Sequence, residues 1–256
     1  MLKKNKRSNQ KQNYDNKLLN KNTPFAITEA FKTLRTNLYY TSNNEACPVF
    51  AITSAYAHAG KSIIISNTAL SYAQLDKKVL LIDADMRCPV INKMFELKNS
   101  DHGLSELLAS PKFEPNDLES FIINSGIYGL DIITSGRIPP NPSELLSSKR
   151  INELLDFAKQ NYDYIFIDLP PICEVADAGV IASLVTGYLF AVRAGTTDTQ
   201  EVADGLEALR QTGANVIGFV LNDVNLKSSK KYYKYGKYGY NRSYAAAKEE
   251  QDKESK

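Results

Sequence analysis

Five continuous apolar runs of strand length recur along this chain, separated by stretches with helical character. The runs contain Val, Ile, Leu, Phe, Ala and Tyr without regular polar alternation, which is typical of strands covered on both faces in a parallel sheet. They lie at Val49 to Thr53, Val79 to Asp83, Tyr164 to Asp168, Tyr188 to Val192 and Val216 to Leu221, with Leu130 to Thr134 as a further candidate.

Helices are expected before and between these strands. An apolar stripe at helical spacing begins at Ile27 and ends at Leu38. Further helices are predicted after Gly60 and over Ser143 to Lys159, Ala176 to Leu184 and Thr199 to Gln211. Strands that alternate with helices predict an α/β fold, a doubly wound and mostly parallel sheet with helices on both faces. Such sheets bind their ligands at the carboxyl ends of the strands.

The first apolar run leads into a loop of small residues that ends in Gly60-Lys61-Ser62, where a helical pattern begins. A helix N-terminus offers unpaired N–H groups and partial positive charge, Lys adds a point charge, and a Ser hydroxyl can ligate Mg²⁺. The full P-loop pattern would have Gly in place of Ala55. Taken alone, the tripeptide fits a nucleotide site and an ordinary strand-to-helix turn equally well.

Acidic residues follow two other runs at the same predicted edge of the sheet. Asp83 and Asp85 end the second run, and Asp168 ends the third. A carboxylate that terminates an apolar strand is costly unless it is paired, hydrogen-bonded or bound to a cation. Each one alone is explained equally well as a helix cap, and Asp177 is expected to be such a cap. Together, beside the loop, the three carboxylates predict a hydrated Mg²⁺ next to phosphate.

Composition limits the class of protein. The chain has 256 residues, of which 43% are hydrophobic and 23% charged, so it can build one large core. No apolar segment reaches the about 18 to 20 residues of a membrane helix, and the N-terminus lacks the apolar run of a signal peptide. The three cysteines have no metal-ligand spacing and suit a reducing compartment. We therefore expect a cytoplasmic protein.

Positive charge is concentrated near the two ends of the chain. Residues 1–23 contain seven Lys or Arg and one acid, and are predicted to be a basic disordered arm. Residues 24–226 are the predicted folded domain, and 227–256 a flexible tail. Basic residues alternate in the tail with Tyr232, Tyr233, Tyr235, Tyr238, Tyr240 and Tyr244. This alternation alone would also fit a platform for single-stranded nucleic acid.

Four motifs together resemble the bacterial tyrosine kinases of capsular and exopolysaccharide systems, which are relatives of the deviant-Walker partition ATPases. The motifs are TSAYAHAGKS, LLIDADMR, IFIDLPP and IPPNPSELLSS, and the resemblance covers about residues 25–224 and the tail. LLIDADMR matches the family's Walker A′ pattern D-x-D-x-R, which ordinary P-loop enzymes lack. The resemblance implies a P-loop NTPase fold of deviant-Walker type, ATP and Mg²⁺ as cofactors, and protein-tyrosine kinase activity.

The resemblance also implies roles for individual residues. Catalysis is expected from Lys61, Asp83 and Asp85, with Asp83 as the base for the incoming tyrosine hydroxyl. The metal is expected at Ser62, Asp85 and Asp168, partly through its waters. Nucleotide binding is assigned to Asn222, as the reader of adenine, and to Ala57, His58, Ala59, Gly60, Lys61, Ser62 and Ile63.

The loop departs from the family pattern S-x-x-P-G-x-G-K-S-T. Ala57, His58 and Ile63 replace the Pro, the loop Gly and the Thr. A left-handed backbone at His58 would cost about 1 kcal/mol or more. Nucleotide binding is compatible with these changes, whereas the catalytic rate is the open point. Tyr56 stands where partition ATPases carry a signature Lys, which argues against that group.

The tail resembles the tyrosine cluster that these kinases phosphorylate on themselves, so its six tyrosines are the predicted phosphorylation sites. At about −1.5 to −2 charges per phosphotyrosine, full phosphorylation would reverse the charge of the tail. Glu29, Lys32 and Arg35 resemble the motif E-x-x-R-x-x-R by which the family packs into rings, with Lys in place of the first Arg. The implied partners are further copies of this chain, a membrane-anchored polysaccharide co-polymerase or activator chain, and a cognate tyrosine phosphatase.

The predicted function is autophosphorylation of the tail between subunits, which regulates polysaccharide polymerisation and export. One alternative is a nucleotide-binding scaffold of the export complex with weak or no kinase activity. A partition-type ATPase is another. The nucleic-acid platform is disfavoured.

Overall fold

The computed structural model describes residues 17–42, 44–97, 102–110 and 118–225. The chain divides into two compact units, residues 1–222 and 223–256. The elements below all lie in the first unit. The first 16 residues of the predicted arm and all six tail tyrosines lie outside the described residues, so the predicted domain boundaries remain predictions.

A seven-stranded sheet forms the centre of the first unit, in the order β3-β4-β2-β5-β1-β6-β7. Every neighbouring pair is parallel except β3 and β4, which run antiparallel. The mostly parallel α/β fold predicted from the apolar runs is therefore confirmed. The strands are β1 (Val49–Thr53), β2 (Val79–Asp83), β3 (Ile123–Ile127), β4 (Leu130–Ile133), β5 (Tyr164–Asp168), β6 (Gly187–Arg193) and β7 (Val216–Asn222).

Nine helical segments accompany the sheet in the described part of the chain. Two predicted helices are each broken in the structure. The stretch Ser143 to Lys159 forms two helices, because Ser148 is extended and ends one helix before the next begins. The stretch Ala176 to Leu184 forms a short helix and a 3₁₀ turn. The segments are α1 (Phe25–Thr41), α2 (Lys61–Ala73), α3 (Ile91–Met94), α4 (Leu104–Ala109), α6 (Pro142–Leu146), α7 (Lys149–Asn161), α8 (Asp177–Val180), η1 (Ala182–Leu184) and α9 (Thr199–Gln211).

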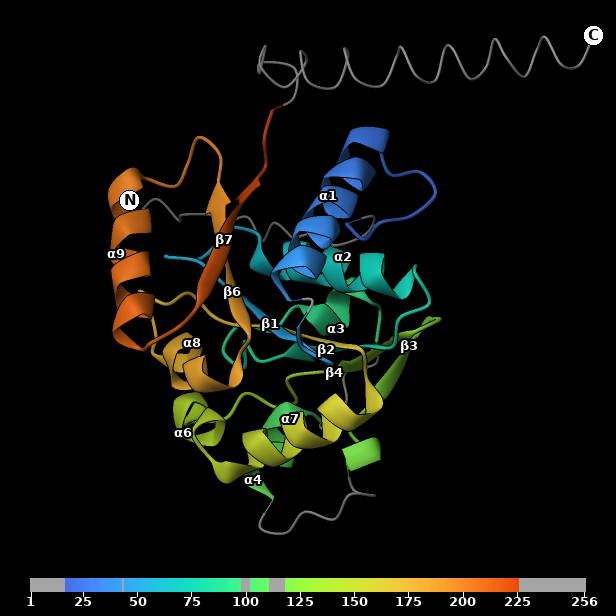
Figure 1. Ribbon diagram of the computed structural model, residues 1–256. Coiled ribbons are helices and arrows are strands. Elements are labelled where there is room, and N and C mark those ends of the chain that lie inside the picture. The colour runs from blue at the N-terminus through green and yellow to red at the C-terminus, as the bar shows by residue number, and fades with distance from the viewer. Residues whose placement is uncertain (1–16, 43, 98–101, 111–117, 226–256) are drawn as a thin grey trace, which may run out of the picture. The chain divides into compact units, whose positions relative to one another are not determined.

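Helices cover both faces of the sheet. In Figure 1, α1, α2 and α3 lie on one face, and α4, α6, α7, α8 and α9 lie on the other. The core is split accordingly. Phe50 and Ile52 of β1 pack into the cluster under α2, whereas Val49 and Ala51 pack into the opposite cluster. Alternate residues of each central strand thus enter two different cores, which explains why the runs are continuously apolar.

Two elements are less covered than their sequences predict. β7 is an edge strand, and its Phe219 and Leu221 are 55% and 56% exposed, so the expectation that both faces of this run are covered is wrong. On α1, Leu38 is buried but Ile27 is 42% exposed, so the apolar stripe packs at its carboxyl end only. None of the described helices has the length and apolar character needed to span a membrane.

Candidate nucleotide site

The loop between β1 and α2, residues 54–60, lies at the carboxyl end of β1, an interior strand between β5 and β6. Gly60 is the N-cap of α2 and has a left-handed backbone, with φ of 89°. A Cβ at this position would lie 2.0 Å from Nδ2 of Asn222. The backbone conformation therefore favours Gly here, and any Cβ would also have to displace the Asn222 amide. The N-terminus of a 13-residue helix is thus aimed at the loop, as a phosphate site needs.

His58, which departs from the family loop pattern, adopts the left-handed backbone that the sequence suggested. His58 has a φ of 66°, so a non-glycine residue holds the left-handed position. Ser54 Oγ donates to Tyr56 O at 2.7 Å, and Asn222 Nδ2 donates to Ala59 O at 3.0 Å. Asn222 therefore contacts the loop directly, and its role toward adenine remains a prediction. Ile63 lies in the first turn of α2 and is half-buried.

Three carboxylates are brought together beneath this loop. Asp83 and Asp168 are paired residues of β2 and β5, and Asp168 also pairs with Ile52 of β1. Asp83 and Asp168 are fully buried, and Asp85 is 7% exposed. Lys61 is 7% exposed as well. The predicted convergence of the three acids on one edge of the sheet is therefore what the register of the strands produces.

Burial and mutual repulsion raise the pKa values of two of these carboxyl groups. Burial raises the pKa of Asp168 to about 7, against the lowering influence of the Lys61 ammonium and the Ser62 hydroxyl, and Asp85 raises it further. Burial also raises the pKa of Asp83 well above its usual range, and Asp168 and Asp85 add to this. Both groups hold protons more tightly than an exposed carboxyl group does.

Two of the three buried carboxylates, Asp83 and Asp168, have oxygens without hydrogen-bond donors. Neither oxygen of Asp168 has a hydrogen-bond partner within the protein. Oδ1 of Asp83 also lacks a partner, while Oδ2 accepts from the Ile91 N–H at 3.3 Å. Buried polar atoms are rarely left in this state. Water molecules around a divalent cation would supply the missing donors.

The residues present fit a hydrated Mg²⁺ rather than a metal held by the protein alone. Among the described residues, no group of three or more His, Cys, Asp or Glu side chains is arranged to hold a metal ion. Mg²⁺ commonly keeps several waters and binds through one or two carboxylates plus substrate phosphates. Ser62, Asp85 and Asp168 are the residues that would surround such an ion.

The sequence reasoning missed an ion pair between the exposed Arg87 and the buried Asp177, which anchors the segment after Asp85. Arg87 Nε donates to Asp177 Oδ2 at 2.9 Å, and its Nη2 donates to Oδ1 at 3.0 Å. Ser143 Oγ also donates to Asp177. The Asp177 side chain is fully buried, and it does not cap α8, so the expected cap is wrong. The sequence feature that could have predicted this ion pair is Arg87, the arginine of the D-x-D-x-R pattern.

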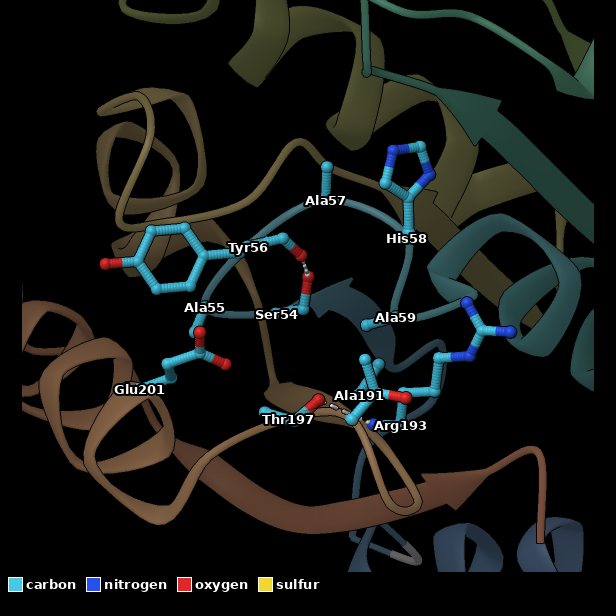
Figure 2. Close-up of a pocket in the computed structure, with 11 residues that line it drawn as sticks. Ser54, Ala55, Tyr56, Ala57, His58, Ala59, Ala191, Arg193, Thr197 and Glu201 are labelled. Atoms are coloured by element: carbon cyan, nitrogen blue, oxygen red, sulfur yellow. Dashed lines mark hydrogen bonds between the residues drawn. The ribbon is translucent and has the colours of Figure 1, made fainter. Parts of the chain in front are cut away.

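A pocket of about 140 Å³ opens beside the loop (Figure 2). The loop forms one wall. The other wall comes from β6, the loop that follows it and α9, which contribute Ala191, Arg193, Thr196, Thr197 and Glu201. Arg193 ends β6, the strand next to β1, and its N–H donates to Thr197 Oγ1 at 2.9 Å. Arg193 and Glu201 were not predicted as site residues, although Arg193 follows an apolar strand at the same edge as the predicted ones.

The residues of the predicted ring motif make contacts within the subunit. Lys32 Nζ pairs with Glu29 Oε1 at 2.7 Å on an exposed part of α1. Arg35 instead donates to the Ser71 carbonyl of α2, and Tyr72 Oη donates to Arg35 O at 3.0 Å. Arg35 therefore helps to hold α1 on α2. Its role between subunits remains a prediction.

Comparison with known proteins identifies the family. A family model described as an AAA domain matches residues 49–189, more than half of the chain. Tyrosine-protein kinase YwqD of Bacillus subtilis is 38% identical over 212 residues, which cover 83% of this chain and 86% of YwqD. The chain belongs to the bacterial tyrosine-protein kinase family. Tyrosine-protein kinase Etk of Escherichia coli K12 is also 38% identical, over 220 residues, but the chain spans only 30% of its length.

Solved structures from the tyrosine-protein kinase family share the fold. The kinase domain of E. coli Etk matches with a TM-score of 0.73 at 38% identity, covering 80% of this chain and 78% of that domain. The chimerical protein CapA2B2 matches with a TM-score of 0.72 at 36% identity, covering 79% and 86%. MinD of Pyrococcus horikoshii, at 18% identity and a TM-score of 0.56, shares the fold alone. The family resemblance and the ATP-binding P-loop fold predicted from the sequence are confirmed.

Proposed function

We propose that this chain is a cytoplasmic protein-tyrosine kinase that uses Mg²⁺ and ATP to phosphorylate its own C-terminal tyrosines between subunits. The observation that carries the proposal is the pair of buried carboxylates, Asp83 and Asp168, with oxygens that lack hydrogen-bond donors, below a loop that ends in Lys61. Such a site is electrostatically incomplete without a cation and a phosphate. The family membership supports the same reaction.

The reaction divides among the residues as follows. Lys61 and the N–H groups at the start of α2 bind the phosphates. Mg²⁺, when bound among Ser62, Asp85 and Asp168, neutralises charge on the phosphoryl group. The tyrosine oxygen bonds to the γ-phosphorus, the bond from that phosphorus to ADP breaks, and the phenolic proton passes to Asp83. Asp83 must be ionised to accept this proton, and bound Mg²⁺ would favour the ionised form against the burial and the neighbouring carboxylates that raise the pKa of Asp83.

The cellular role is proposed from the family resemblance. Phosphorylation of the tail would reverse its positive charge and so regulate capsular or exopolysaccharide polymerisation and export. The partners are a membrane-anchored co-polymerase or activator chain that recruits the kinase to the membrane, and a cognate tyrosine phosphatase. Assembly of a homo-oligomeric ring is proposed through Glu29, Lys32 and Arg35 of α1, on the resemblance of these residues to the family's ring motif.

A second candidate is a nucleotide-binding scaffold of the export complex with weak or no kinase activity. The observation that favours it is the left-handed His58, which stands where family loops carry Gly and which puts a side chain beside the pocket. The scaffold would bind Mg·ATP without transferring phosphate. Nucleotide binding therefore does not separate the two candidates, but phosphotyrosine formation does.

The decisive experiment incubates the full chain with Mg·ATP and the cytoplasmic segment of the activator, followed by anti-phosphotyrosine blotting. Wild type is expected to gain phosphotyrosine. Lys61→Ala is expected to lose at least about 100-fold in rate, because one preorganised charge contributes this much to transition-state stabilisation. Lys77→Ala, an exposed lysine at the opposite end of β2, is the matched control and should resemble wild type. Nucleotide binding by a wild type that forms no phosphotyrosine would favour the scaffold.

Transfer between subunits is tested by mixing two variants, neither of which can phosphorylate its own tail. One chain carries Lys61→Ala and an intact tail, and the other carries an intact site and Phe in place of the six tail tyrosines. Phosphotyrosine on the Lys61→Ala chain supports transfer between subunits. If that chain stays unmodified while wild type alone is active, the tail enters its own site.

A further inference from the structure

The loop 54–60 is held along one side by the segment 169–176, which connects β5 to α8. Hydrogen bonds between backbone groups, and one from the Thr53 hydroxyl, form a ladder between this segment and the end of β1 together with the start of the loop. This ladder ties the loop to the segment that follows Asp168. Its contacts are Leu169 N–H to Ile52 O at 3.2 Å, Thr53 Oγ1 to Pro170 O at 2.8 Å, Ile172 N–H to Ser54 O at 2.9 Å and Cys173 N–H to Ala55 O at 3.2 Å.

A side chain adds one more contact where the backbone ladder ends. The Ala57 N–H donates to Oε1 of Glu174 at 2.8 Å. The backbone of Glu174 is itself held in a turn, because its N–H donates to Pro171 O at 3.3 Å. The carboxylate therefore extends the ladder by two residues, as far as the residue before His58.

Position 57 is where this chain most needs such a contact. Family loops carry Pro there, which has no N–H and a nearly fixed φ. Ala57 has an N–H that needs an acceptor and a φ that is free to vary, and it lies on the negative-φ side in this structure. The next residue, His58, must remain left-handed without the help of a glycine. A restraint on Ala57 limits the conformations that the loop can adopt around His58.

We propose that Glu174 is a positioning residue of the nucleotide site, which holds the Ala57 N–H and so fixes the loop in the conformation that phosphate binding requires. The inference rests on the proposed role of loop 54–60 in binding nucleotide. Glu174 acts through geometry, because a negative charge beside a phosphate site does not attract the ligand. It performs through a hydrogen bond the restraint that Pro performs covalently in the family pattern.

The test is a double-mutant cycle on the full chain, with Mg²⁺ and a fluorescent N-methylanthraniloyl ADP as the probe. Glu174→Ala is expected to weaken binding about 3- to 10-fold, because the contact is charge-assisted but exposed to solvent. Glu174→Gln keeps an acceptor oxygen and should stay within about 2-fold of wild type. Ala57→Pro removes the N–H and restricts φ, so Glu174→Ala should have no further effect in the Ala57→Pro background.

The control is Asp204→Ala, which removes a negative charge of α9 whose carboxylate accepts a hydrogen bond from Gln200 of the same helix. It should leave binding unchanged. If Glu174→Ala and Glu174→Gln both tighten binding, the carboxylate acts as a repulsive charge and the proposal is wrong. The proposal is also wrong if Glu174→Ala weakens nucleotide binding by the same factor in the Ala57→Pro background as it does in wild type.

A second measurement covers the case in which Ala57→Pro fails to fold. Hydrogen exchange of the amides in residues 54–60 should become faster in Glu174→Ala and remain slow in Glu174→Gln. Unchanged exchange in Glu174→Ala would contradict a restraint on the loop. The probe reports nucleotide binding and not phosphate transfer, so a chain that binds ADP normally but forms no phosphotyrosine would refute the kinase proposal without affecting this one.

Discussion

Replacement of Asp168 by Asn tests the electrostatic description of the site most directly. The pKa of Asp168 is raised from 3.8 to about 7, so the folded chain without ligand holds a proton there that the unfolded chain has lost. The unfolding free energy contributed by this group is full below pH 4 and decreases as the pH rises toward 7 and beyond. A shift of about three pKa units corresponds to a loss of about 4 kcal/mol between pH 4 and pH 8.

Urea denaturation of wild type and Asp168→Asn, without nucleotide or Mg²⁺, measures this loss. Asn is neutral and nearly isosteric, so the unfolding free energy of the variant is expected to gain about 4 kcal/mol relative to wild type between pH 4 and pH 8. The readout is how the difference in unfolding free energy between the two proteins changes with pH. An Asn amide without a hydrogen-bond partner lowers the stability of the variant equally at every pH, so it does not alter this readout. Mg·ADP should stabilise wild type more than the variant, because the metal needs the carboxylate. Parallel stability curves over this pH range would refute the reasoning.

Two further substitutions test the geometry of the site. Gly60→Ala combines a left-handed φ with a clash against Asn222, so it is expected to lower the free energy of unfolding by about 2 kcal/mol and to remove most nucleotide affinity. Gly195→Ala has a similar φ but open space, and should lower the free energy of unfolding by about 1 kcal/mol. Equal losses for the two variants in urea denaturation would contradict the clash. Arg87→Met should lower the free energy of unfolding by about 3 to 5 kcal/mol, because it leaves the buried Asp177 carboxylate without its ion-pair partner. Asp177→Asn should lower it by only about 1 to 2 kcal/mol, because Arg87 is 38% exposed and can reach water. A larger loss in Asp177→Asn than in Arg87→Met would show that the unpaired arginine is the costlier group.

The central strands were predictable because burial on both faces leaves a clear pattern in the sequence. Alternate residues of β1, β2 and β5 enter different cores, so each run is apolar throughout. The antiparallel edge strand β3 reads INSGI and has only alternating partial burial, which gives no such run. β7 is apolar yet stays at an edge, because the period of a sequence does not reveal which strand ends the sheet.

The candidate site was predictable where single residues mark the ends of strands. Asp83 and Asp168 are paired across β2 and β5, as two acids that terminate apolar strands of one parallel sheet should be. The contacts of Asp177 and Glu174 were not predictable in the same way. Glu174 lies in the loop after β5 and Asp177 begins α8, whereas their partners Ala57 and Arg87 lie in two other loops. Such pairs depend on how connecting segments cross, which strand periodicity does not describe.

The two halves of the site differ in what holds them without ligand. The loop 54–60 is satisfied by protein groups: Glu174 and Asn222 engage two of its backbone atoms, and Gly60 is fixed by its surroundings. The carboxylates are not satisfied by protein groups, because both oxygens of Asp168 lack hydrogen-bond donors. The loop can therefore keep its shape before nucleotide arrives, whereas Asp168 must release a proton when a metal binds near or below pH 7. Metal, proton and stability are thus linked at this residue, and the free energy of metal binding offsets part of the cost of burying its charge.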